Sequence, residues 1–293
     1  MTWYLWAVIS LIATSFEEII DKVVIIKKPT KIDPFVASFF RNFAFFVFTL
    51  IAGILMVFGK ISFFFNINIL ILAILWPLNS LAYDYFLRNI ELSRSQGVFY
   101  TFPFIFLFIE NVFFHISYSY LQITGIILLV LGAIIFSFDG SLKIPVFNLK
   151  SILWMFIKLA TYAYFLIVYK MFENDVNEIS FYFSTWIIVI SFYLIIIMLT
   201  RKYKKLRQTA VSENFLKKTF LSKGCAFIAS IFYLKALSLT NLTQISAFTS
   251  FSPIILLLIL LMISHFSNIN VAEDFSRKSL GYKIIATIVL AIG

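Results

Sequence analysis

The chain has almost no cysteine or histidine: its 293 residues include one cysteine and two histidines. A single thiol, Cys225, excludes a disulfide within the chain and argues against a cysteine-based metal site. The histidines, His115 and His265, each end an apolar run, and a metal would need further ligands at the same depth. The sequence therefore predicts no metal and no cofactor.

Motifs of soluble enzymes and ATP-driven pumps are missing too. The chain has no Walker loop, no dinucleotide-binding glycine fingerprint and no HExxH pair. Charged residues make up only 13% of it, apolar residues 61%, and the mean hydropathy is +0.97. One soluble core could not hide that much apolar surface, so the chain belongs in a bilayer.

The formal net charge of +10 does not indicate a nucleic-acid partner. Lys and Arg stand between apolar runs, where the bilayer interface accounts for them. The N-terminal segment MTWYLWAVIS has no basic region and no small-residue cleavage site, so we expect a retained first span rather than a signal peptide.

Apolar runs of about 20 residues, the length that crosses a hydrocarbon core, fill nearly the whole sequence. They predict ten transmembrane helices, the last of them short: 3–20 (or 3–26), 35–58, 69–87, 97–115, 120–138, 152–171, 181–200, 224–239, 244–264 and 280–293.

A long internal repeat links the two halves of the chain. Residues 80–115 and 230–265 align without a gap, and eight of 36 positions are identical, including the proline and the final histidine. Five spans per copy is an odd number, so the second copy enters the membrane from the opposite face. The sequence thus predicts an all-α polytopic membrane protein with two inverted five-helix repeats, 1–140 and 150–293, and such halves are typical of transporters.

Loop charge gives an orientation for these helices. The loops after the odd-numbered spans hold 18 of the 24 Lys and Arg, and the loops after the even-numbered spans hold two. The positive-inside rule then places the basic loops in the cytoplasm and both termini outside.

Short motifs in both halves occur in the order and spacing of a known family. The chain resembles the drug/metabolite transporter superfamily, specifically the ten-span EamA-type permeases. The matching pieces are SFEEIIDK ending at Lys22, YFLIVYK ending at Lys170, Arg41, the segment ELSRSQGVFYTFP with Gly125 after it, and LTNLTQISAFTSFSP before Gly281.

That resemblance implies ten helices around a central cavity lined mainly by spans 1, 3, 4, 6, 8 and 9, used to export amino acids, metabolites or drugs. Two features differ from the family pattern. The Gly-Glu pair that commonly closes span 4 or 9 is replaced by His115-Ile116 and His265-Phe266. Relatives usually keep both termini in the cytoplasm, opposite to the orientation that the loop charges predict.

Ionisable residues inside spans are candidates for function, because each costs about 2.5–3.5 kcal/mol to insert. Glu17 and Glu18 lie near the end of the first span. If that span ends at Ile20 they are interfacial, and if it continues to Ile26 one of them could carry a proton. Lys158 and Arg41 lie one or two turns inside their spans, where snorkelling to the interface is the default explanation.

The third span carries a polar stripe at helical spacing. Trp76, Asn79, Ser80, Tyr83 and Asp84 share one face, which must turn toward protein or water and serve either as a binding surface or as a packed seam.

In the second copy of the repeat, Ser230 and Tyr233 match Ser80 and Tyr83. Leu234 stands at the position of Asp84, and Lys235 follows it. We therefore expect either that Asp84 and Lys235 face each other across a pseudo-two-fold axis, or that both lie near helix ends.

Glu110, inside the fourth span, is the strongest candidate for a proton-coupling carboxylate, the alternative being a hydrogen-bonded structural acid. We also expect helix kinks at Pro77, Pro103 and Pro253. Gly125 and Gly132, seven residues apart, could pack helices within the chain or between two copies in a homodimer.

These features predict a secondary transporter of the bacterial inner membrane, not an enzyme, exchanging protons for a small amphipathic solute. Two alternatives stay open. One is a lipid or polyprenyl-carrier flippase of the same fold. The other is an intramembrane lipid-linked transferase, which would need an acid and a base at one depth and a sizeable polar loop.

Overall fold

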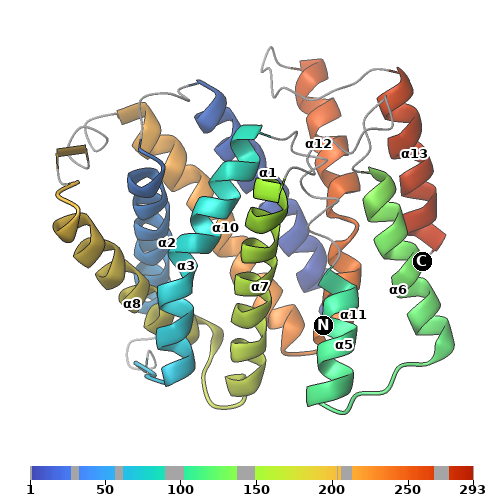
Figure 1. Cartoon of the computed structure of the whole chain (residues 1–293), viewed down its shortest axis with the longest axis horizontal. Helices are drawn as coiled ribbons and strands as arrows, with labels where there is room; N and C mark the ends of the chain where they lie inside the picture. The colour runs from blue at the N-terminus through green and yellow to red at the C-terminus, as the bar shows by residue number, and fades with distance from the viewer. Residues whose placement is uncertain are drawn as a thin grey trace.

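The computed structural model describes residues 2–27, 33–56, 62–89, 102–136, 149–202, 204–205, 213–266 and 277–292, and every longer element in them is an α-helix (Figure 1). The helices are α1 (Trp3–Lys27), α2 (Pro34–Met56), α3 (Ile67–Asn89), α5 (Phe102–Phe113), α6 (Tyr120–Phe136), α7 (Leu149–Phe172), α8 (Glu178–Leu199), α10 (Glu213–Leu237), α11 (Leu242–Thr249), α12 (Ser252–Phe266) and α13 (Arg277–Ile292).

Seven segments of the described chain are long and apolar enough to cross a membrane. They are α1, α2, α3, α7, α8, α10 and the combined stretch of α11 and α12, while α5 and α6 are shorter apolar helices. The prediction of a polytopic helical membrane protein is confirmed at this level. The predicted start at Gly97 and the ELSRSQG segment lie outside the described residues.

The structure decides the open end of the first span and corrects two predicted helix starts. The first helix continues to Lys27, so the longer version of span 1 is the correct one and both of its glutamates lie well inside it. The helix α10 begins at Glu213, eleven residues earlier than predicted, so Lys223 is helical and buried rather than part of a loop. The last helix begins at Arg277 instead of Leu280.

The ninth predicted span is two helices. The helix α11 ends at Thr249, and α12 begins at Ser252 with Pro253 as its second residue. A proline in the first turn removes no intrahelical hydrogen bond, so Pro253 fits the start of a new helix. Pro103 likewise is the second residue of α5, whereas Pro77 lies inside α3, which continues through it.

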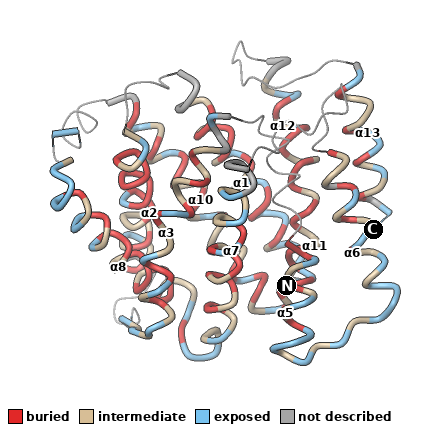
Figure 2. The backbone as a smooth tube through the Cα atoms, in the orientation of Figure 1, coloured by how far each residue is buried: buried red, intermediate tan, exposed pale blue. Residues whose placement is uncertain are grey.

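Helices from the two halves of the sequence pack against each other in pairs. The pairs with the most extensive packing are α1 with α10, α6 with α13, α3 with α7, α2 with both α10 and α8, and α5 with α11. Burial follows these contacts, with buried residues on the faces that meet inside the bundle (Figure 2). Apolar side chains such as Met198 and Leu121 point outward, 75% and 83% exposed, as expected of a lipid-facing surface.

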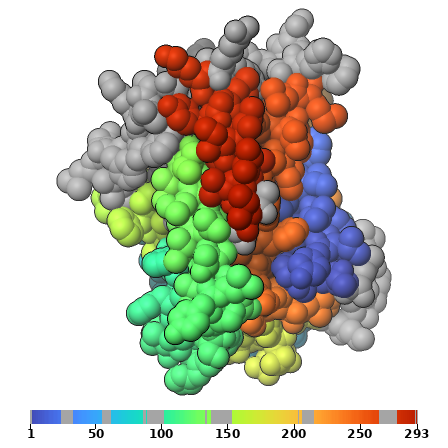
Figure 3. Space-filling model, turned by 90° about the vertical axis from the view of Figure 1, so that its right-hand side faces the viewer, coloured from blue at the N-terminus to red at the C-terminus, as the bar shows by residue number. Residues whose placement is uncertain are grey.

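The pair α6 and α13 forms one side of the molecule (Figure 3). A Cβ atom at Gly132 of α6 would lie 2.7 Å from Leu290 Cγ of α13, so only glycine permits this approach. Gly132 therefore serves a contact within the chain. The argument from this glycine for a homodimer is not supported.

Candidate functional site

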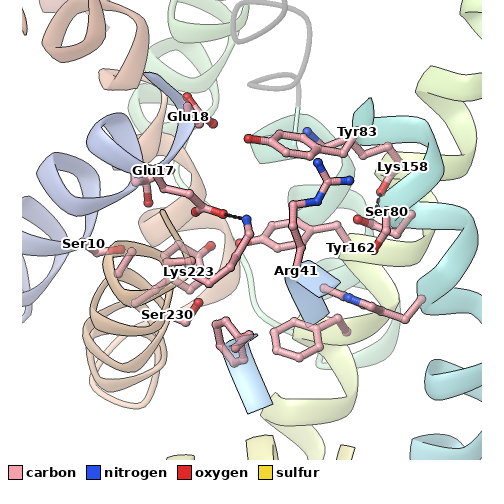
Figure 4. Close-up of a pocket in the computed structure, with 18 of the residues that line it drawn as sticks. Ser10, Glu17, Glu18, Arg41, Ser80, Tyr83, Lys158, Tyr162, Lys223 and Ser230 are labelled. Atoms are coloured by element: carbon pink, nitrogen blue, oxygen red, sulfur yellow. Dashed lines mark hydrogen bonds and ion pairs between the residues drawn. The ribbon is translucent and has the colours of Figure 1, made fainter. Parts of the chain in front are cut away.

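A cavity of about 270 Å³ lies inside the bundle, lined by eight helices from both halves of the chain (Figure 4). These are α1, α3, α5, α7, α10 and α11, with additional residues from α2 and α8. Eight of the predicted site residues line it: Glu17, Glu18, Trp76, Asn79, Ser80, Tyr83, Ser230 and Tyr233.

One wall of the cavity carries a cross-helix ion-pair cluster. Lys223 of α10 pairs with Glu17 of α1, and its Nζ donates to Asp21 Oδ2 at 2.9 Å. Ser222 Oγ donates to the other Asp21 oxygen at 2.5 Å. Asp21 is 2% exposed and stands behind the lysine, so a buried cation is held by one acid on the cavity wall and one beneath it.

The opposite wall has a second buried ion pair, between Arg41 of α2 and Asp84 of α3. Arg41 lines the cavity, while Asp84, 2% exposed, lies behind it. The predicted pairing of Asp84 with Lys235 is therefore wrong. The Lys235 side chain is 50% exposed and its nearest acid is Glu178 at 3.6 Å, because the α10 backbone turns that side chain to the surface.

Tyr83 stands at the centre of the cavity cations. Lys158 Nζ lies 4.6 Å from its ring centroid, and Arg41 Cζ and Lys223 Nζ each lie 5.9 Å away, all within cation–π distance. The Tyr83 hydroxyl is buried and has no hydrogen-bond partner among the described residues. Figure 4 shows it directed across the cavity toward the α1 wall, where Glu18 is located.

Aromatic rings form the other end of the cavity. Trp186 of α8 contacts Phe45, Trp76, Phe165 and Tyr182, with ring centroids 4.8–6.1 Å apart. All five residues line the cavity. One of these contacts is stacked and three are edge-on, which are favourable arrangements of aromatic pairs, so this end is a packed, apolar surface.

Hydrogen bonds fix the polar stripe of α3. Trp76 Nε1 donates to Asn42 Oδ1 at 2.9 Å, and the Asn42 amide donates to Ser80 Oγ at 3.2 Å. On the α7 side, Asn79 Nδ2 donates to Thr161 Oγ1 at 2.7 Å. These bonds join α3 to α2 and α7, as a packed seam between helices would, and the same residues of α3 line the cavity. The polar stripe therefore combines the two predicted alternatives, a packed seam and a binding surface.

Glu110, the strongest predicted proton carrier, does not line the cavity. It is 1% exposed and accepts hydrogen bonds from the backbone N–H groups of Leu242 at 2.6 Å and Thr243 at 3.1 Å. Tyr118 also donates to it, and burial together with this bond raises the pKa of Tyr118. The structural alternative is the one that the geometry favours.

A lysine contacts the α10 side of the turn between α10 and α11, whose α11 side donates hydrogen bonds to Glu110. Lys170, at the end of α7, donates to the carbonyl oxygens of Leu237 at 3.3 Å and Thr240 at 3.1 Å. The last carbonyl of α10 and one in the turn after it thus face a cation, and the first amides of α11 face a carboxylate, which matches the partial charges of helix ends.

His115 follows the end of α5 with a positive φ of 55°, and His265 lies in the last turn of α12. No group of three or more His, Cys, Asp or Glu side chains in the described part of the chain is placed to hold a metal ion.

The lining residues that sequence reasoning did not assign to a site include three cations and a tyrosine: Arg41, Lys158, Lys223 and Tyr162. Arg41 and Lys158 were assigned to snorkelling although each lies six residues inside its predicted apolar segment, a signal for an internal partner. Lys223 was missed because the helix start was placed after it. Tyr162 carries no sequence signal that separates it from the many other aromatic residues.

No protein-family model matches the chain, and no curated protein matches it. A solved structure described only as "Crystal structure of protein" is similar over 99% of this chain and 97% of its own length, with a TM-score of 0.65 and 10% sequence identity. At this identity the likeness shows the fold alone.

Proposed function

We propose that the chain is a secondary transporter of a small amphipathic solute, working by alternating access between two inverted repeats in the manner of the EamA-type permeases that its motifs resemble. The observation that carries the proposal is the cavity. It combines buried charges with aromatic rings, and its walls come from both halves of the chain.

The pattern of helix pairs supports the repeat. If α1, α2, α3, α5 and α6 are spans 1–5 and α7, α8, α10, α11 with α12, and α13 are spans 6–10, exchanging the halves maps the pair α1–α10 onto α7–α3. It maps α2–α8, α5–α11 and α6–α13 onto themselves. All of these pairs are in contact, as a pseudo-two-fold relation requires.

The buried charges favour transport over a purely structural role. Each ion in the bilayer interior costs about 2.5–3.5 kcal/mol on insertion scales, and such residues characteristically serve substrate or ion pathways. Glu17 and Glu18 are on the cavity wall, so they replace Glu110 as the carboxylates proposed to couple solute movement to protons.

The orientation follows from charge. Asp33, just before α2, accepts hydrogen bonds from Lys202 and Lys205 beyond the end of α8, so these segments share one face of the bundle. We place this face in the cytoplasm by the positive-inside rule. A reporter that is silent in the periplasm, inserted between residues 206 and 212, should be active; a silent reporter in an intact protein would reverse the orientation.

Counterflow into proteoliposomes tests the function. Vesicles preloaded with amino acids, nucleosides or cationic drugs should take up the labelled form of one of these solutes, and the recovered solute should be chemically unchanged. Lys158→Gln should lower the initial rate at least tenfold, and the matched surface variant Lys235→Gln should leave it unchanged.

Other outcomes would contradict the proposal. A chemically altered solute would indicate an enzyme, and exchange of short-chain lipids alone would indicate a flippase. Exchange that Lys158→Gln leaves intact would show that the cavity is not the transport site.

A further inference from the structure

The cavity is polarised along the bundle, with charges at one end and rings at the other. The helices α2 and α7 begin at the same face of the molecule (Figure 1). Arg41 precedes Phe45 by four residues on α2, and Lys158 precedes Phe165 by seven on α7. At 1.5 Å per residue, the cations lie about 6–10 Å nearer to that face than the rings.

The charges on the cavity wall are not balanced. Three cations, Arg41, Lys158 and Lys223, line the cavity together with only two carboxylates, Glu17 and Glu18. Asp84, which holds Arg41 from behind, does not line it, whereas Lys223 is shared between Glu17 on the wall and Asp21 beneath it. Arg41 is therefore oriented by an acid outside the cavity, and its outer surface is turned to the cavity.

The three cations also converge. All lie within 5.9 Å of the centroid of the Tyr83 ring, although they come from three different helices. Three cations so close to one ring create a positive potential around it, from which an anion in the cavity gains. The Tyr83 hydroxyl adds a buried donor with no hydrogen-bond partner among the described residues.

From this arrangement we infer that the transported solute is a small organic anion, a carboxylate on an apolar or aromatic body. The carboxylate binds among Arg41, Lys158 and the Tyr83 hydroxyl, and the body lies against Trp76 and Trp186. The volume of about 270 Å³ is just below the range of about 300–1,000 Å³ for pockets that hold drug-sized ligands, so the solute is small. That the anion is carried across the membrane rests on the proposed transport function. That the cavity binds an anion rests on the cavity alone.

Four probes with the same ring and different charge test the ligand class. Phenylacetate is an anion, phenethylamine a cation, phenylalanine a zwitterion and phenethyl alcohol is neutral. Each is titrated into the purified full-length protein in detergent, and binding is followed by tryptophan fluorescence and by the thermal unfolding midpoint. We expect the dissociation constant of phenylacetate to be at least tenfold lower than those of the other three.

Three variants locate the anion. Arg41→Gln and Lys158→Gln should each raise the dissociation constant of phenylacetate at least tenfold, and Tyr83→Phe, which keeps the ring and removes only the hydroxyl, should raise it about threefold. The variant Tyr83→Phe keeps the test valid if loss of Arg41 prevents folding. Lys235→Gln, which removes a surface cation, is the control and should bind like the parent protein.

Tighter binding of the cation or the zwitterion, equal binding of all four probes, or no binding of any probe would overturn the inference. A short-chain phosphatidate carries its negative charge on a lipid body, and its displacement of phenylacetate would overturn the assignment to a small solute. Phenylacetate binding without counterflow of any solute would refute the transport function and leave the ligand class unchanged. Counterflow of a solute without preference for anions would refute the ligand class and support the transport function.

Discussion

The Glu110 carboxylate on α5 accepts a hydrogen bond of 2.6 Å from the backbone N–H of Leu242, the first residue of α11. Asn241 occupies the N-cap position of α11 but makes no side-chain cap. The cap of this short helix is therefore supplied by the other half of the chain. Since α11 contributes Ser246 and Thr249 to the cavity, this contact helps to set the position of the cavity wall.

Removing this cap should destabilise the protein. Glu110→Ala leaves two buried amides without their acceptor, at a cost of about 1–3 kcal/mol each. Thermal unfolding in detergent measures the loss. The control is Glu178→Ala, which removes an acid paired with the exposed Lys235 and should cost less than about 1 kcal/mol. Equal midpoints for the two variants would contradict a capping role.

Lys223 should be the most sensitive single position in the cation cluster. Lys223→Met leaves Glu17 and Asp21 facing each other without their cation, and breaking a buried pair in this way costs about 3–5 kcal/mol. A triple variant that also carries Glu17→Gln and Asp21→Asn should recover most of that loss in unfolding experiments. If the added neutral residues bring no recovery, the lysine matters for some reason other than these two acids.

The partner of Asp84 can be identified by exchanging charges. Asp84→Arg and Arg41→Asp should each abolish counterflow and lower the unfolding midpoint, because each buries two like charges. Together they restore an opposite pair, and we expect at least a tenth of the parental rate to return. Combining Asp84→Arg with Lys235→Asp should restore nothing. Rescue by that combination instead would support the pairing of Asp84 with Lys235.

Asp33 should give the protein an acid-sensitive contribution to stability. Burial raises the pKa of its carboxyl, but the hydrogen bond from Lys205, the charge of Lys202 and the backbone N–H of Val36 lower it by more, so the pKa lies below its ordinary value. A depressed pKa stabilises the fold above the unfolded-state value of about 3.9 and loses that effect as the pH falls through the folded value. The parent protein should therefore unfold at a higher temperature than Asp33→Asn at neutral pH, with the difference shrinking below about pH 4. A difference that stays constant from pH 7 to pH 2 would rule this out.

Three helical glycines provide a graded packing test. A Cβ at Gly132 meets Leu290 at 2.7 Å, one at Gly224 meets the Phe48 ring at 3.2 Å, and one at Gly281 meets nothing within 4 Å. We expect Gly132→Ala to cost about 1–3 kcal/mol by overpacking and Gly224→Ala to cost less. Gly281→Ala should stabilise by up to about 1 kcal/mol through helix propensity. A Gly132→Ala variant that is as stable as Gly281→Ala would contradict the close packing of α6 on α13.

Much of the architecture was predictable because the bilayer restricts what a sequence can do. Long apolar runs must become helices there, and a polar stripe such as Asn79, Ser80 and Tyr83 must face protein or water. The sequence alone therefore determined the helical class, most of the spans and eight of the residues that line the cavity. Its internal similarity also singled out Ser230 and Tyr233, which line the cavity.

Only the tertiary structure decided what each buried charge does. Glu110 and Asp84 have similar sequence surroundings, a lone acid among apolar residues, yet one caps α11 and the other holds Arg41. Their partners are on other helices, and which side chain meets which depends on helix rotation and on boundaries such as the early start of α10. Helical periodicity shows which residues share a face of one helix, but not which neighbour that face meets. The convergence of Arg41, Lys158 and Lys223 around one tyrosine ring comes from the packing of four helices, and no single segment of sequence contains it.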